Sequence, residues 1–187
     1  MLMYCNIAKY NVDVRVKGLF WLAFLTLLPA VAAYGQASNP KATVEAFYRY
    51  DQTHSQAFDR GSIEARKKWF SPELYRLFQY ELKREAEYLK KNSTDKPYFG
   101  DGLPFQPLQE NCENSRGAAR RLSVKQDFQK GNRSVVLATF AYPKPCKNAD
   151  PITYTIGLIR GKTGWQIDDI NYGEDTSLKQ RLNRKEY

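Results

Sequence analysis

The sequence predicts an α+β fold in which N-terminal helices pack on a curved antiparallel sheet of about four strands, preceded by a signal peptide. Three observations predict it. Apolar residues recur at the helical period of about 3.6 residues between positions 39 and 91. They alternate with polar residues, as in half-buried strands, between positions 120 and 172. An uncharged apolar segment, residues 19–33, lies close to the N-terminus.

The N-terminal segment has the three parts of a secretory signal peptide. Residues 1–18 carry three basic groups and one acid, the apolar segment 19–33 follows, and Gly35 and Ala37 provide the small residues that a signal peptidase reads. We therefore expect cleavage between Ala37 and Ser38. The alternative is an uncleaved signal anchor.

Cleavage would leave one domain, residues 38–187, in the periplasm or secreted from the cell. The apolar segment is shorter than the ~20 residues that a spanning helix needs, and Pro29 interrupts it. We therefore expect no stable membrane span after cleavage.

Cysteine usage agrees with an oxidising compartment. Cys5 lies in the segment expected to be removed, which leaves Cys112 and Cys146 as an even pair. We predict a disulfide between them. A metal site is not indicated, because two isolated cysteines and one histidine lack the spacing of a zinc ligand set. We expect neither a metal nor a cofactor.

The net charge limits the classes of partner. The full chain has a net charge of +9, and residues 1–37 contribute three basic groups and one acid, so the remainder carries +7. A basic domain outside the cytoplasm is expected to attract an anionic partner or a cell-envelope component, and nucleic acid is not an expected ligand there. Alternatively, the basic surface only maintains solubility.

Turn and capping residues divide the chain into elements. Asn39 and Ser71 each precede a proline, which is typical of a helix N-cap followed by its first turn. Gly131-Asn132 is typical of a tight hairpin turn, as is Gly161 to Gly164. The expected elements are a helix at 39–58 ended by Gly61, a short amphipathic stretch at 63–70, a helix at 72–91, a long loop at 92–117, strands at 120–129, 133–142, 152–160 and 164–172, and a closing helix at about 176–184.

Two places depart from the apolar patterns and carry titratable side chains. Asp51 lies on the apolar stripe of the first helix beside Tyr48, and His54 lies one turn later. A buried carboxylate next to an imidazole can act as a general base or anchor a ligand. The alternative is that the helix ends near Asp51 and that both residues are solvated.

The last strand contains the second departure. Apolar residues occupy positions 165 and 167 and then shift to 170 and 172, which predicts a β-bulge at Asp168-Asp169. Bulges often direct side chains toward a pocket, and the alternative is a strand-end kink with two solvated carboxylates. The pocket candidates are Tyr48, Asp51, His54, Trp165, Asp168 and Asp169.

The order of several short motifs resembles a known family. Pro40-x-x-x-Val44-x-x-Phe47-Tyr48, the Phe70-Ser71-Pro72-Glu73-Leu74 element, the Gly-Asp-Gly-Leu-Pro-Phe loop and the final Trp-x-Ile-Asp-Asp-Ile-x-Tyr strand resemble exported bacterial proteins of the domain of unknown function family 3828. The resemblance covers most of residues 40–182. It implies a nuclear transport factor 2-like, cystatin-like cone, with a cavity between helices and sheet, and it implies no activity.

Two functions follow as hypotheses. The first is a binding domain without chemistry of its own, which uses the cone cavity for a small ligand or the basic surface for a partner. The second is a small acid–base enzyme, because dehydratases, isomerases and polyketide cyclases of this wider fold use an Asp or His inside the cone. Asp51 would be the base and His54 its partner. No nucleophile elbow, phosphate-binding glycine loop or HExxH motif occurs in the sequence.

Overall fold

The computed structural model describes residues 39–107, 121–141, 150–173 and 175–185. The predicted signal peptide at 1–37, its cleavage site, and the predicted disulfide partners Cys112 and Cys146 lie outside these residues. The elements are α1 (Pro40–Asp51), α2 (Arg60–Arg66), the 3₁₀ turn η1 (Lys67–Trp69), α3 (Pro72–Lys91), β1 (Arg121–Lys130), β2 (Arg133–Ala141), β3 (Ile152–Gly161), β4 (Gly164–Asn171) and α4 (Leu178–Leu182).

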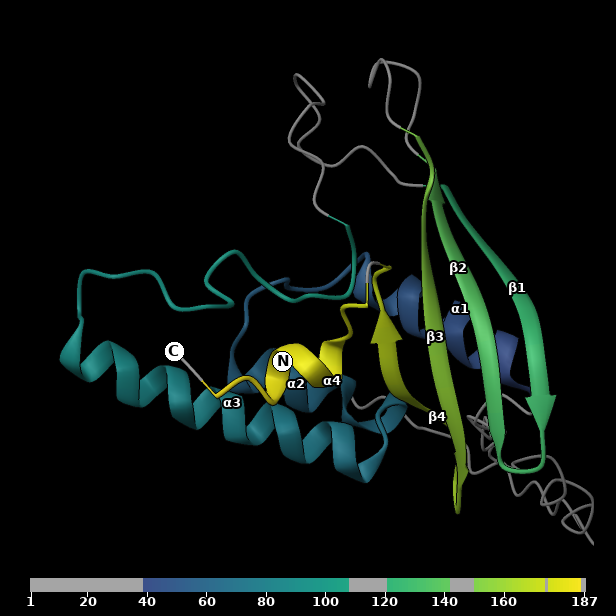
Figure 1. Cartoon of the computed structure of the whole chain (residues 1–187), viewed down its shortest axis with the longest axis horizontal. Coiled ribbons are helices and arrows are strands. Elements are labelled where there is room, and N and C mark those ends of the chain that lie inside the picture. Colours follow the sequence, from purple (N-terminus) through teal and green to yellow (C-terminus); the bar gives the residue numbers. More distant parts are fainter. Residues whose placement is uncertain (1–38, 108–120, 142–149, 174, 186–187) are drawn as a thin grey trace, which may run out of the picture. The chain divides into compact units, whose positions relative to one another are not determined.

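The four strands form one antiparallel sheet in the order β1-β2-β3-β4, with helices packed against it. In Figure 1, α1 crosses one face of the sheet, and α2, α3 and α4 gather on the same side near β4. Gly131 and Gly164 take positive φ angles of 59° and 120° in the two hairpin turns, which glycine adopts without a side-chain clash. The predicted α+β class and the four antiparallel strands are confirmed.

The first helix is shorter than predicted. It ends at Asp51 instead of continuing to residue 58, and residues 52–57 carry no large apolar side chain that would extend the buried stripe. Asp59 then caps a new helix by accepting a hydrogen bond from the Ser62 N–H at 2.7 Å. Gly61 therefore lies inside α2 and does not end α1, so this part of the prediction is wrong.

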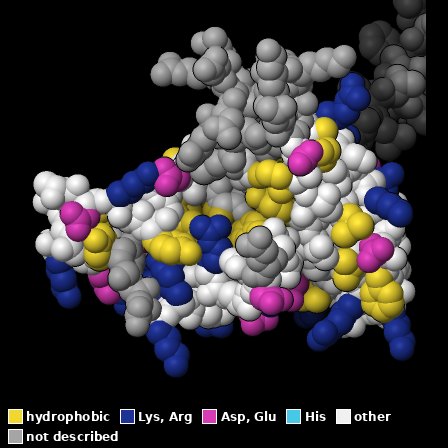
Figure 2. All heavy atoms as spheres, turned by 45° about the horizontal axis from the view of Figure 1, so that its top comes forward, with side chains coloured by type: hydrophobic (Ala, Val, Ile, Leu, Met, Phe, Trp, Pro, Cys, Tyr) yellow, Lys and Arg dark blue, Asp and Glu magenta, His cyan; other side chains and the backbone are white. Residues whose placement is uncertain are grey.

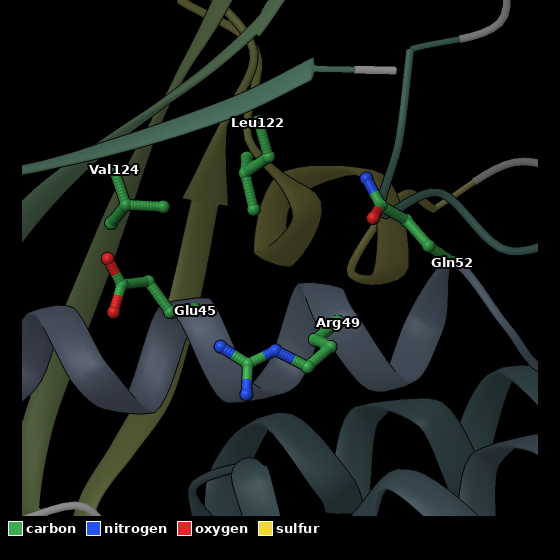
Figure 3. A pocket seen from close by; sticks show the side chains of 5 residues that line it. All are labelled: Glu45, Arg49, Gln52, Leu122 and Val124. Atoms are coloured by element: carbon green, nitrogen blue, oxygen red, sulfur yellow. The ribbon is translucent and has the colours of Figure 1, made fainter. Parts of the chain in front are cut away.

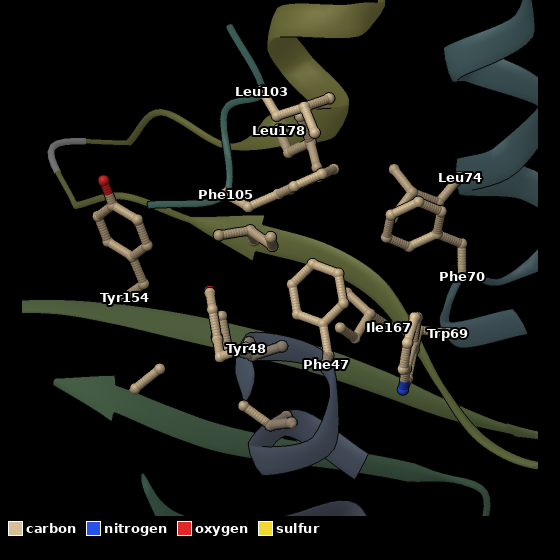
Figure 4. Close-up of a cluster of buried hydrophobic side chains, with 14 of the residues drawn as sticks. Phe47, Tyr48, Trp69, Phe70, Leu74, Leu103, Phe105, Tyr154, Ile167 and Leu178 are labelled. Carbon is tan, nitrogen blue, oxygen red and sulfur yellow. The ribbon is translucent and has the colours of Figure 1, made fainter. Parts of the chain in front are cut away.

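Aromatic side chains fill the space between the helices and the sheet (Figure 4). The Phe47 ring lies 5.0 Å from the Tyr48 ring and 5.2 Å from the Phe105 ring, both in edge-to-face geometry. Phe105 belongs to the irregular segment after α3 and is completely buried. The described part of the predicted long loop, residues 92–107, thus contributes Phe99, Leu103 and Phe105 to the hydrophobic core.

Long apolar helices are not found in the part of the chain that the structure describes: none of its helices has the length and hydropathy needed to cross a membrane. The longest, α3, buries one face, with Leu74, Leu77 and Phe78 in the core, and exposes charged side chains and Tyr80 elsewhere. It is an amphipathic helix that covers the core.

Candidate functional site

Asp51 is the last residue of α1 and is completely buried, but it is not a free base. Arg66 of α2 donates its Nε hydrogen to Asp51 Oδ1 at 2.7 Å, and the Gln106 amide donates to Asp51 Oδ2. Both carboxylate oxygens therefore have donors. The carboxylate is thus held by a charge-assisted hydrogen bond from Arg66 and by the Gln106 amide, in a position with no exposure to solvent.

Arg66 itself is fully engaged. Its two terminal nitrogens donate to the backbone carbonyls of Ser62 and Ser55, each at 2.9 Å. The guanidinium also lies 5.5 Å from the centre of the Tyr50 ring. The ion pair therefore holds the turn between α1 and α2 in place, which is a structural task.

His54 lies outside this buried group. It is exposed, its Nδ1 is 2.7 Å from the Tyr50 carbonyl, and its ring stacks on the Tyr50 ring with 3.6 Å between centroids. Among the residues that the structure describes, no hydrogen bond joins its side chain to Asp51. The alternative that the helix ends near Asp51 is confirmed, whereas its second part, solvation of both residues, holds for His54 and is wrong for Asp51.

The predicted bulge in β4 is confirmed at Asp168. Gly157 pairs with Asp169 and Leu158 pairs with Ile167, so Asp168 is the extra residue. The Ser71 hydroxyl donates to Asp168 Oδ1 at 2.7 Å, and Lys179 Nζ lies 2.8 Å from Asp168 Oδ2. The bulge thus joins β4 to the starts of α3 and α4 and is not a solvated kink.

The neighbouring carboxylate has a similar task. Asp169 Oδ1 accepts the backbone N–H groups of Ile170 and Lys179, both at 2.9 Å. Burial alone would lower the pKa of Lys179, but its hydrogen bonds with Asp168 and Glu73 outweigh this effect and raise it. Both bulge carboxylates are therefore occupied by contacts within the fold.

The two aromatic candidates are core residues. Trp165 is 3% exposed and Tyr48 is completely buried. The Tyr48 hydroxyl has no hydrogen-bond partner in the described part of the chain. Burial raises the pKa of Tyr48 well above its ordinary value, and Tyr172 and Asp51 add to the shift, so the phenol stays neutral. Tyr48 and Trp165 thus belong to the hydrophobic core, whereas the side chains of Asp51, Asp168 and Asp169 are held by contacts within the fold.

A pocket of about 270 Å³ lies elsewhere, between α1 and the edge strand β1 (Figure 3). Its lining residues are Glu45, Arg49, Gln52, Leu122 and Val124. The three polar residues follow each other at spacings of four and three, so they form one flank of α1. The two apolar residues alternate on β1 and point toward that flank (Figure 3).

The sequence contains a signal for this pocket that our reading missed. Leu122 and Val124 are only partly buried, because β1 has a neighbouring strand on one side only. A row of polar residues beside the apolar stripe of α1 faces them. The alternation of Leu122 and Val124 with polar residues, together with the polar row on α1, could have indicated the pocket. This would have required β1 to be predicted at the edge of the sheet.

The pocket combines opposite charges with an apolar wall. Glu45 lies 3.5 Å from Lys41 in an exposed ion pair, which is worth only about 0.3–0.5 kcal/mol. Arg49 is exposed and has no ion pair within the described ranges. A guanidinium, an amide and a carboxylate can therefore receive polar groups of a ligand. The five lining residues thus combine charged, amide and apolar groups, a composition typical of binding pockets.

Other types of site are less well supported. Searching the described residues finds no group of three His, Cys, Asp or Glu side chains that could hold a metal. On the face shown in Figure 2, Lys and Arg side chains are spread among Asp and Glu and do not form one basic patch. The pocket beside β1 is therefore the candidate site.

Known proteins do not extend this assignment. No family model, curated protein or solved structure matches the chain.

Proposed function

We propose that this protein is an exported, non-catalytic binding domain whose binding site is the pocket between α1 and β1. The signal-like segment at 1–37 supports export to the periplasm or beyond. The ordered motifs support membership of the domain of unknown function family 3828 and a nuclear transport factor 2-like cone. Helices packed on a four-stranded antiparallel sheet agree with that proposal.

The observation that carries the binding function is the contrast between the core and the pocket. The core is filled by aromatic side chains, and Asp51 is neutralised by Arg66. The pocket instead presents Arg49 without an ion pair, next to apolar side chains of an edge strand. Ligands gain most where polar groups can be paired beside apolar surface that is still partly exposed.

The enzyme hypothesis has no comparable support. It needs Asp51 as a base and His54 as its partner, yet Asp51 accepts from Arg66 and Gln106, and His54 stacks outside on Tyr50. A general base must reach the proton that it removes. Neither residue lines the pocket beside β1.

Affinity capture from the host's cell envelope tests the proposed site. The bait is the protein as its host exports it, with Arg49→Ala as the site variant and Arg76→Ala as the control. Arg76 is an exposed arginine of α3, so its substitution removes the same charge from a helix surface away from the pocket. We expect the same captured species with the wild type and Arg76→Ala, and its loss with Arg49→Ala. Equal capture by all three proteins would contradict the proposed site.

Mass spectrometry of the exported protein tests the other parts of the proposal. We expect an N-terminus near Ser38 and a mass two hydrogens lower than that of the reduced chain, from a bond between Cys112 and Cys146. An intact Met1 would instead indicate a retained anchor. Two free thiols would contradict the disulfide.

A further inference from the structure

Resting on the proposed function, we infer that the ligand is an extended peptide segment of a partner protein, which adds to the free edge of β1 as a fifth strand. Two of its side chains would point toward α1. The first, a basic residue, would pair with Glu45, and the second, an acidic residue two positions later in the peptide, would pair with Arg49.

Within the described part of the chain, β1 has an edge without a partner strand next to the pocket. It is the first strand in the order β1-β2-β3-β4 and pairs with β2 only. No backbone hydrogen bond joins the other edge of β1 to another described residue. Such an edge offers a row of N–H and C=O groups to an incoming strand.

Only one half of this edge suits an incoming strand. Pairing with β2 is regular from Arg121 to Gln126, and a register shift follows between Gln126 and Phe128. Bulges of this kind protect edges against further pairing. The regular half contains Leu122 and Val124, the two apolar residues of the pocket. Strand addition would therefore occur where the pocket lies.

The spacing of charges on α1 matches a strand. Glu45 and Arg49 are four residues apart, which corresponds to a rise of about 6 Å along the helix. Side chains on one face of a strand repeat about every 6.6–6.8 Å. Two successive inward side chains of an added strand can thus each meet one of these charges, while their stems cover Leu122 and Val124.

The arrangement also sets the order of the charges. In Figure 3, Glu45 lies next to Val124, and Arg49 lies next to Leu122, so α1 runs opposite to β1. An antiparallel fifth strand would run in the direction of α1. From its N-terminus, this strand would pass Glu45 before Arg49. Its sequence would therefore contain a basic residue, then one residue of any type, and then an acidic residue. Antiparallel pairing is favoured because it is slightly more stable per residue than parallel pairing.

A second copy of this chain is a poorer occupant. Its own β1 would bring Leu122, Val124 and Gln126 to the pocket, with no acid for Arg49. Antiparallel pairing about Ser123 would also place Arg121 opposite Lys125 on the outer face, and like charges across a ladder destabilise it. Charge complementarity therefore favours a different protein.

Two capped peptides of identical composition test the inference on the protein purified from its host. One contains Thr-Lys-Thr-Glu-Thr and the other Thr-Glu-Thr-Lys-Thr. We expect the first to bind about tenfold more tightly by calorimetric titration, since two ion pairs replace two repulsions. In NMR spectra it should shift amide signals of residues 121–126. The double variant Glu45→Arg/Arg49→Glu, with folding verified by circular dichroism, should reverse the preference.

Three results would overturn the inference. Equal affinity of the two peptides would contradict the proposed order of charges. No binding by either peptide would contradict the addition of a strand. A dimer in native mass spectrometry that the first peptide does not displace would assign the edge to a second copy. If capture from the envelope still depends on Arg49 in any of these cases, the proposed binding site stands and only the peptide strand fails.

Discussion

Arg66 Nε and Asp51 Oδ1 lie 2.7 Å apart, and both side chains are at most 1% exposed. A carboxylate on the apolar stripe of a helix can be a catalytic base or part of a buried ion pair. The second description applies here. Its consequences can be measured as stability, without knowledge of the ligand.

Replacing Arg66 should strongly destabilise the protein. Arg66→Met leaves the Asp51 charge buried without its cation, and we predict a loss of about 3–5 kcal/mol in the free energy of unfolding, measured by urea denaturation. Adding Asp51→Asn should recover most of this loss, because the uncompensated charge is then gone. Arg76→Met, an exposed arginine on α3, is the control. A loss below about 1 kcal/mol for Arg66→Met would contradict the structural role.

Ser71 and Asp168 should be energetically coupled. Ser71 Oγ accepts the Leu74 N–H at 3.1 Å as the N-cap of α3 and donates to Asp168 at 2.7 Å. We predict that Ser71→Ala costs about 1 kcal/mol and that a double-mutant cycle with Asp168→Ala gives a coupling of about 0.5–3 kcal/mol. Asn39→Ala removes the cap of α1 and should be additive with Asp168→Ala. If the effects of Ser71→Ala and Asp168→Ala were also additive, the hydrogen bond between the two side chains would be contradicted.

Stability should depend on pH through Glu85. Glu85 is buried and accepts the Phe99 N–H at 2.7 Å. Burial raises its pKa, although the Phe99 N–H opposes this shift. The folded state therefore takes up a proton at higher pH than the unfolded chain, in which the pKa of a Glu side chain is 4.5. The contribution of Glu85 to stability improves as the pH falls from above the raised pKa of the folded state to below 4.5.

Glu85→Gln provides the measurement. It keeps an acceptor for Phe99 and does not titrate. The free energy of unfolding of the wild type minus that of Glu85→Gln should be constant at high pH and should increase as the pH is lowered toward 4.5. A difference that decreases over the same range would show that the pKa is lowered in the folded protein.

The Tyr48 hydroxyl should be dispensable. It is buried without a hydrogen-bond partner in the described part of the chain, and leaving a polar group in this state costs about 1–3 kcal/mol. We predict that Tyr48→Phe raises the free energy of unfolding and leaves capture at the pocket unchanged. Tyr172→Phe is the matched control. Its hydroxyl donates to the Pro104 carbonyl at 2.7 Å, so its removal should lower stability. Loss of capture with Tyr48→Phe would instead implicate the core in binding.

The sheet could be predicted closely because its signal is local. The alternation of Tyr154, Ile156 and Leu158 with small residues indicates a strand with one buried face, and all three are buried. The glycines of the two hairpin turns predicted the antiparallel pairing of β1 with β2 and of β3 with β4. The bulge at Asp168 could also be found, since a phase slip is visible within eight residues of sequence.

The site could not be predicted because its determinants are distant in sequence. The role of Asp51 depends on Arg66, which lies fifteen residues later in the chain and donates to its carboxylate. The filling of the core depends on Phe105, from a segment that reads as a loop. The pocket depends on β1 being at the edge of the sheet, which is a property of the whole topology. Periodicity within one element contains none of this information.

Photo-crosslinking in the living host tests the central claim, binding at the pocket between α1 and β1, most directly. Gln52, at the pocket, is replaced by p-benzoylphenylalanine, and Arg76 on α3 is replaced in the same way as the control. We predict an ultraviolet-dependent adduct of defined mass from position 52 and none from position 76. An adduct from position 76 alone, or none from either, would contradict the account.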